Sequence, residues 1–267
     1  MVQAPLATDK VVTEIEGSIG WLTFNNPARR NAVSVEMWRA VPEALDRLEA
    51  DTAVRVIVVR GAGDKAFVSG LDISQFEDEF ASSSAAAGLE ALSARANERI
   101  RGSPRPTIAM IHGFCIGAGV QIAASCDLRI AADSATLAIT AARLGLGYPV
   151  VSLQRLIALV GPAGVKEIFF TGRQFSAAKA SAMGLVNRVV PAAELESAVR
   201  ACCETIAANA PLTIAAVKQA VDALATKPSA SELDACERVM KACFDSADYA
   251  EGRRAFREKR RPVFTGR

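Results

Sequence analysis

The chain has 267 residues, of which 51% are hydrophobic and 22% are charged, as is typical of an ordinary folded globular protein. Its 31 Lys and Arg residues nearly balance its 29 Asp and Glu residues, so the formal net charge is +2. This balance provides no general field that would attract nucleic acid or a membrane surface, and any anionic ligand must be held by local basic residues.

The first ten residues contain Asp9 but no charged segment followed by an apolar run, so we expect no signal peptide. No uninterrupted apolar segment approaches the roughly 20 residues that cross a bilayer. The six cysteines occur without Cys-x-x-Cys spacing, which favours a reduced chain without structural zinc. The sequence therefore predicts a cytoplasmic protein that does not bind a membrane.

The first two thirds of the chain alternate between strand-like and helix-like segments. Ser34 caps a predicted helix that extends to about residue 50, and a second helix over residues 88–101 is followed by the helix breaker Pro106. The predicted strands cover residues 11–15, 20–24, 55–60, 107–111, 128–131 and 136–139. The low-complexity residues 81–88 are predicted to form a mobile loop. This alternation predicts an α/β core.

From about residue 192 onward the strand signal disappears and helical periodicity takes its place. The predicted helices cover residues 194–209, 212–225, 231–244 and 248–259. We therefore divide the chain into a core of residues 1–191 and a helical C-terminal region of residues 192–267. The apolar faces of these helices either cover the core or meet a neighbouring subunit.

The segment from His112 to Gln121, His-Gly-Phe-Cys-Ile-Gly-Ala-Gly-Val-Gln, reads as a buried strand that turns through glycines into a helix. Backbone N–H groups at such a turn can hold a developing negative charge. No Asp or Glu occurs at residues 99–126 or 134–166. A site at this turn would therefore be rich in backbone donors and poor in carboxylates.

The sequence disfavours three other common kinds of site, which bind a dinucleotide, a nucleoside triphosphate or a metal ion. Gly117-Ala-Gly119 begins like a dinucleotide-binding fingerprint, but Ile122 occupies the position of the third glycine. Residues 61–65 are glycine-rich yet lack the Gly-Lys-Ser/Thr ending of a P-loop. His112 is the single histidine, which excludes multi-histidine metal sites, and its position at a strand end favours a structural role.

Several segments, in order along nearly the whole chain, carry a family resemblance. They are Ala66-Phe-Val-Ser-Gly-Leu-Asp-Ile73, the stretch from His112 to Gln121, Cys126-Asp-Leu-Arg-Ile-Ala-Ala-Asp133 and Phe256-Arg-Glu-Lys-Arg-Arg-Pro-Val-Phe264. Together they resemble the crotonase superfamily, also called the enoyl-CoA hydratase/isomerase family. The resemblance implies a spiral of repeated ββα units, followed by a helical region that mediates homotrimers or dimers of trimers.

The resemblance also implies a substrate class and a set of site residues. Crotonase proteins bind acyl-CoA thioesters and stabilise a thioester enolate with two backbone N–H groups, which here would belong to Leu71 and Ala118. In a site that excludes water, one such donor contributes on the order of 3 kcal/mol. Coenzyme A enters as part of the substrate, so no separate cofactor is expected.

For coenzyme A itself, the resemblance assigns a binding track along the first oxyanion loop and a contribution from the C-terminal end. The track would use Arg29, Ser69, Asp72 and Ile73. Phe256 would form an aromatic wall of the acyl pocket, and Lys259 would reach the nucleotide from an adjoining region or a neighbouring subunit. Without the family resemblance, residues 253–261 would be interpreted as a solvated basic cluster at the end of a helix.

The chain departs from the family at two positions. Hydratases of this family use two glutamates to place and ionise water, and Gln121 and Ala141 stand at those positions. An amide can orient water but cannot accept its proton at ordinary pH, and a methyl group can do neither. The sequence therefore predicts enolate chemistry without standard water addition or single-carboxylate isomerisation.

Tyr148, in Leu-Gly-Leu-Gly-Tyr-Pro, resembles a tyrosine of methylmalonyl-CoA decarboxylase-like members, although those members often carry histidine where this chain has Leu71. Decarboxylation needs no strong base, because carbon dioxide departs and leaves the enolate. Alternatively, Tyr148 only packs at a turn. Residues 77–79, Glu-Asp-Glu, could supply a carboxylate or form a solvated face.

Three functional hypotheses follow. The first is an acyl-CoA enzyme that works through an enolate, with Tyr148 and Gln121 assisting, either as a hydratase/isomerase relative or as a decarboxylase. The second is a protein that binds acyl-CoA without turnover. The third is a homologue that serves assembly alone.

Overall fold

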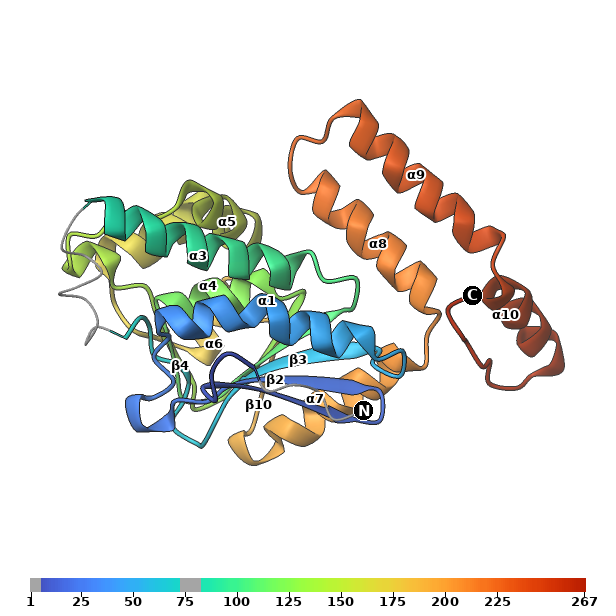
Figure 1. Ribbon diagram of the computed structural model, residues 1–267, viewed down its shortest axis with the longest axis horizontal. Coiled ribbons are helices and arrows are strands. Elements are labelled where there is room, and N and C mark those ends of the chain that lie inside the picture. The colour runs from blue at the N-terminus through green and yellow to red at the C-terminus, as the bar shows by residue number, and fades with distance from the viewer. Residues whose placement is uncertain (1–5, 73–82) are drawn as a thin grey trace.

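The computed structural model describes residues 6–72 and 83–267. Figure 1 shows a layered core of sheets and helices, from which a helical arm extends to one side. The strands are β1 (Val11–Glu16), β2 (Ile19–Phe24), β3 (Val56–Gly61), β4 (Ala66–Val68), β5 (Thr107–Ile111), β6 (Phe114–Ile116), β7 (Leu128–Ala132), β8 (Thr136–Ala138), β9 (Phe175–Ser176) and β10 (Arg188–Val190).

Helices alternate with strands along the chain as far as β10, and the described chain after β10 contains helices but no strands. The α-helices are α1 (Val35–Ala50), α3 (Ser83–Arg101), α4 (Ala118–Ser125), α5 (Val150–Thr171), α6 (Ala177–Ala182), α7 (Leu195–Ala207), α8 (Pro211–Leu224), α9 (Ala230–Phe244) and α10 (Ala247–Glu258). Short 3-10 helices are η1 (Pro27–Arg29), η3 (Ala141–Arg143) and η4 (Ala192–Glu194). Within the described residues, no helix combines the length and apolarity needed to cross a membrane.

The strands form two sheets, one with the order β1-β2-β3-β5-β7-β10 and the other with the order β4-β6-β8-β9. The pairs β3/β4, β5/β6 and β7/β8 each place their first strand in the large sheet and their second strand in the small sheet. The helices α3, α4 and α5 follow these pairs in turn. The structure therefore confirms the predicted spiral of ββα units.

The core lies between the sheets and the helices that cover them. Strand β2 and the first four residues of β3 are buried, because both faces of this mainly parallel sheet are covered. Helix α1 begins where Ser34 predicts, since the Ser34 Oγ accepts a 3.4 Å hydrogen bond from the Met37 N–H. Trp21, Trp38 and Phe67 are among the largest fully buried side chains.

The prediction of a mobile loop over residues 81–88 is wrong for its described part, because helix α3 already begins at Ser83. Three consecutive alanines at residues 85–87 favour helix, since alanine has the highest helix propensity. Helix α5 was not predicted. Its sequence contains Gly161 and Pro162, and Gly161 has a non-helical backbone that kinks the helix.

The predicted C-terminal helices are present, but they differ in what they contact. Helix α7 packs against β3, β5 and β7 of the large sheet. Helices α8 and α9 pair with each other, and Figure 1 shows them extending away from the sheets as the arm. The domain boundary at residue 192 stays a prediction.

Candidate active site

A cavity of about 770 Å³ lies beside the small sheet, between α3, the first turn of α4 and the segment that leads into α5. Most of the residues predicted for the site line this cavity, namely Arg29, Ser69, Leu71, Asp72, Ala118, Gln121, Ala141 and Tyr148. Four segments that are far apart in the sequence therefore meet at one place, as the sequence predicts.

The first cavity loop, residues 69–72, follows β4 and is held by the segment around Val33. The Val33 N–H donates to the Gly70 carbonyl oxygen at 2.9 Å, and the Asp72 N–H donates to the Val33 carbonyl oxygen at 3.0 Å. These two bonds flank Leu71, whose own N–H has no hydrogen-bond acceptor among the described residues. The Leu71 N–H is therefore available to a ligand.

Asn31 fixes the segment that supports this loop. Its side chain is fully buried, and its Nδ2 donates to the carbonyl oxygens of Ala62 at 2.9 Å and Ala66 at 2.7 Å. Its backbone has a φ of 57°, a conformation that asparagine tolerates better than most residues. The sequence analysis missed Asn31, although an asparagine in an otherwise basic loop signals such a turn.

The second cavity loop leads into α4. Gly117 is the N-cap with a φ of 52°, and its N–H donates to the Ala138 carbonyl oxygen at 2.8 Å. Ala118 occupies the first helical position, where the backbone N–H has no intrahelical acceptor, and no other described residue accepts from it. The Ala118 N–H is therefore the second available donor.

The two cavity loops lie against each other. An added Cβ on Gly117 would be 3.9 Å from the Gly70 Cα, so the residues next to Leu71 and Ala118 are in van der Waals contact range. Two unpaired N–H groups, one of them at the positive end of a helix, thus line the same cavity. Such a pair can stabilise an oxygen that develops negative charge.

Tyr148 provides a neutral polar group near the Gln121 side chain. Its ring packs edge-on against Phe169 with centroids 4.6 Å apart, and its buried Oη has no hydrogen-bond partner among the described residues. Burial raises the pKa of Tyr148. The nearby Gln121 amide has a smaller, opposite effect on this pKa, although it lies outside hydrogen-bond geometry with the hydroxyl. Tyr148 therefore stays protonated at ordinary pH and keeps an unused hydrogen-bond donor.

The charged groups of the cavity come from three segments. Arg29 Nη1 and Asp72 Oδ1 are 3.2 Å apart, and the Ser69 Oγ donates to the Arg29 carbonyl oxygen at 3.2 Å, so these three predicted residues form one cluster. Glu90 of α3 also lines the cavity. The sequence analysis missed Glu90, because a charge beside the apolar stripe of a helix looks like a solvated residue.

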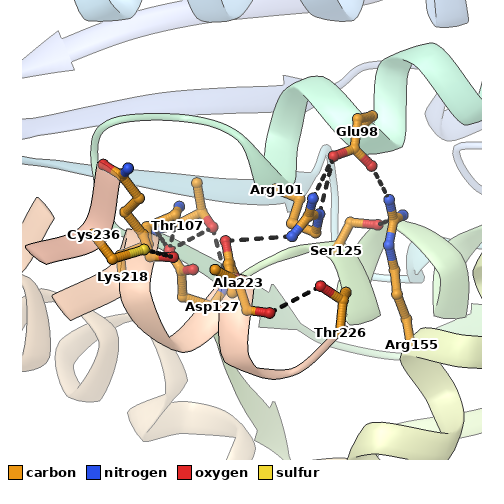
Figure 2. A network of polar contacts seen from close by, with 12 residues as sticks. Glu98, Arg101, Thr107, Ser125, Asp127, Arg155, Lys218, Ala223, Thr226 and Cys236 are labelled. Atoms are coloured by element: carbon orange, nitrogen blue, oxygen red, sulfur yellow. Dashed lines mark hydrogen bonds and ion pairs between the residues drawn. The ribbon is translucent and has the colours of Figure 1, made fainter. Parts of the chain in front are cut away.

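A polar network behind the cavity links helices α3, α4 and α5, as Figure 2 shows. The Ser125 Oγ donates to the Gln121 carbonyl oxygen at 2.8 Å and accepts from Arg155 Nη1 at 3.0 Å. Arg155 of α5 also pairs with Glu98 of α3. The network therefore joins α3, α4 and α5 one turn behind the Gln121 side chain.

Of the remaining predicted site residues, Phe256 and Lys259 do not line the cavity of the single chain. Ile73 and the acidic residues 77–79 lie outside the described residues. Phe256 is 86% exposed, and Lys259 follows α10; both are absent from the cavity lining. Burial lowers the pKa of His112, as expected of a structural imidazole, and no cluster of potential metal ligands occurs within the described residues.

Comparison with known proteins identifies the family. The family model for enoyl-CoA hydratase/isomerase matches residues 14–267. The short-chain-enoyl-CoA hydratase of Clostridium acetobutylicum is 31% identical over 95% of this chain and 96% of its own length. The mitochondrial enoyl-CoA hydratase domain-containing protein 2 of Bos taurus is 36% identical over 93% of this chain and 84% of its own length.

A solved structure agrees with these sequence relationships. The crystal structure of an enoyl-CoA hydratase/carnithine racemase from Magnetospirillum magneticum superimposes with a TM-score of 0.91 at 36% identity. The match covers 98% of this chain and 97% of that one. With a matching family model, similar relatives and this shared fold, the chain belongs to the enoyl-CoA hydratase/isomerase family of the crotonase superfamily.

Proposed function

We propose that this protein acts on an acyl-CoA thioester through an enolate whose oxygen is held by the N–H groups of Leu71 and Ala118. The observation that carries the proposal is the pair of unpaired backbone donors on adjoining loops of one cavity. Preorganised donors of this kind stabilise charge that develops during the reaction. The names of the hydratase relatives support the same substrate class.

The coenzyme A portion of the substrate would be bound by Arg29, Ser69, Asp72 and Ile73. The ion pair between Arg29 and Asp72 supports this assignment, because it fixes a cationic side chain at the edge of the cavity. The chemistry requires no separate cofactor, since coenzyme A arrives with the substrate. A cytoplasmic location stays a prediction, and one of the relatives is mitochondrial.

We further propose a homotrimer or a dimer of trimers, in which the C-terminal region of one subunit meets the site of another. In the single chain Phe256 is highly exposed, and neither it nor Lys259 lines the cavity. This placement supports a role across a subunit interface. Molar mass measured by light scattering tests the assembly.

The reaction itself is proposed to proceed without the two-carboxylate activation of water. The amide of Gln121 and the methyl group of Ala141 line the cavity, and neither side chain can accept a proton from water at ordinary pH. We therefore expect slow hydration of crotonyl-CoA. Restoring a carboxylate with Ala141→Glu should raise the hydration rate.

Decarboxylation of a malonyl-type thioester is the second candidate, favoured by the protonated and unpartnered Tyr148 hydroxyl. The bond between the α-carbon and the departing carboxylate would break, and its electron pair would remain as the enolate. Carbon dioxide would leave, and a proton would then be added at the α-carbon. Binding of acyl-CoA without turnover is the remaining alternative.

A substrate panel read by mass spectrometry tests these proposals. Crotonyl-CoA hydration is compared with methylmalonyl-CoA decarboxylation for the parent and for the variants Tyr148→Phe, Gln121→Ala and Ala141→Glu. Turnover that falls in Tyr148→Phe supports a role for the hydroxyl, and unchanged turnover removes that role. Rapid hydration by the parent contradicts the expected loss of water addition, whereas binding with no turnover identifies a binding protein.

A further inference from the structure

Glu90 is a carboxylate that faces the cavity without a partner. The carboxylates among the described lining residues are Asp72, which pairs with Arg29, and Glu90. No described residue forms an ion pair or a hydrogen bond with the Glu90 side chain. A negative charge in a cavity lined mainly by apolar side chains is therefore left to interact with a ligand or with solvent.

The packing of α3 along α4 sets the position of Glu90 relative to the backbone donors. The Ser125 Oγ of α4 lies 3.4 Å from the Asn97 Oδ1 of α3, and this contact lies one helical turn behind the cavity. Ser93, one turn closer to the start of α3, lines the cavity together with Gln121 of α4. Both helices therefore have their N-terminal part at the cavity and continue away from it.

Equal lengths of helix lead back from this contact to the cavity. Glu90 precedes Asn97 by seven residues, and Ala118 precedes Ser125 by seven residues. Each segment spans about 10 Å at the helical rise of 1.5 Å per residue. Glu90 and Ala118 therefore each lie about two helical turns from this contact, and both residues line the cavity.

We propose that Glu90 is a further catalytic residue, the proton acceptor for the acyl portion of the bound thioester. This inference rests on the proposed enolate function. A Glu90 carboxylate oxygen would take a proton from the carbon next to the thioester carbonyl. The electron pair of the broken C–H bond would form the enolate, with its negative charge on the oxygen held by Leu71 and Ala118.

The exposure of Glu90 suits this role, because a carboxylic acid in contact with water exchanges its proton with the solvent. Return of a proton to the acyl carbon would regenerate the carboxylate and complete the cycle. In D₂O the returned atom is deuterium, so the acyl group gains mass without net reaction. The role also explains how enolate formation can proceed although Gln121 and Ala141 provide no carboxylate.

The test follows deuterium incorporation into butyryl-CoA in D₂O by mass spectrometry. Glu90→Gln should lower the exchange rate by about 100-fold or more, the range in which a general base contributes. Glu90→Asp should retain an intermediate rate, while the Kd of butyryl-CoA should stay within about twofold of the parent value for both variants. Glu204→Gln, which removes an exposed charge on α7 outside the cavity, should exchange at the parent rate.

The outcomes separate this inference from the proposed function. Exchange that persists at the parent rate in Glu90→Gln overturns the assignment of Glu90 and leaves enolate formation standing. A parent that decarboxylates a malonyl thioester but exchanges no butyryl-CoA proton likewise overturns Glu90 as the base. A parent that binds thioesters but neither exchanges protons nor turns over any substrate contradicts both proposals.

Discussion

At Gly119 the first turn of α4 passes so close to β4 that an added Cβ would lie 2.3 Å from the Val68 carbonyl oxygen. Val68 belongs to the strand that leads into the first cavity loop, and its backbone oxygen cannot rotate away as a side chain could. A Gly119→Ala substitution would therefore push α4 away from β4. Because Ala118 is the preceding residue, the same shift would displace its N–H from the Leu71 N–H.

We expect Gly119→Ala to lower the free energy of unfolding by about 1 to 3 kcal/mol, the usual cost of overpacking, and to reduce turnover. Urea unfolding and the exchange assay measure the two effects. Gly88→Ala is the matched control, since Gly88 lies in α3 and no atom of the described residues lies within 4 Å of an added Cβ. That change should stabilise the protein slightly, because alanine favours helix over glycine. Equal unfolding curves for Gly119→Ala and the parent contradict this account.

The sequence predicted the cavity residues that lie within recognisable motifs. Leu71, Ala118, Gln121 and Tyr148 all line the cavity, because the glycine turns and the family segments fix where the backbone bends. Glu90 could not be found in this way, since its relation to Ala118 depends on how α3 packs along α4. Contacts between distant segments have no signature in the local order of residues.

Helix α4 begins at Ala118 of the cavity, and Arg129 lies shortly after its C-terminal end. The buried guanidinium of Arg129 donates from Nη1 to the Cys126 carbonyl oxygen at 2.7 Å and from Nε to the Leu185 carbonyl oxygen at 2.7 Å. Burial lowers the pKa of Arg129, and the carbonyl oxygens compensate the loss of water. This residue therefore anchors the C-terminal end of the helix that begins at Ala118.

Arg129→Met should lower the free energy of unfolding by about 3 kcal/mol, because it leaves several buried carbonyl oxygens without a donor. Urea unfolding at a fixed protein concentration measures the change. Arg173→Met serves as the control, since Arg173 is exposed and its side chain forms no ion pair or hydrogen bond with the described residues. A stability loss no larger than that of Arg173→Met would show that Arg129 contributes little.

At the level of elements, the strands rich in β-branched residues were predicted, whereas helix α5 and several short strands were not. Residues 11–15 and 107–111 correspond to β1 and β5. The strands β4 and β10 have three residues each, too few for an alternation of buried and exposed side chains to be recognised. Their positions are set by pairing with neighbours in the two sheets rather than by their own sequences.

In the whole molecule, two ion pairs link helix α8 of the arm to the core. Lys218 Nζ of α8 lies 2.7 Å from Asp127 Oδ2, a pair that Figure 2 shows. Asp222 of α8 pairs with Arg101 of α3. The neighbouring row of α8, formed by Val217, Val221 and Leu224, is exposed. The helix thus turns its charged row toward the core and leaves its apolar row uncovered in the single chain.

The uncovered row leads to a prediction about assembly that rests on the proposed homotrimer. Val221 is 58% exposed at the middle of the row, and a glutamate there would place a charge in a buried apolar interface, which is costly. We expect the parent to have three or six times the mass of one chain by light scattering, and Val221→Glu to dissociate toward the single-chain mass. Gln219→Glu adds the same charge on the opposite side of α8 and should leave the assembly intact. If Val221→Glu retains the parent mass, this row does not form the subunit interface.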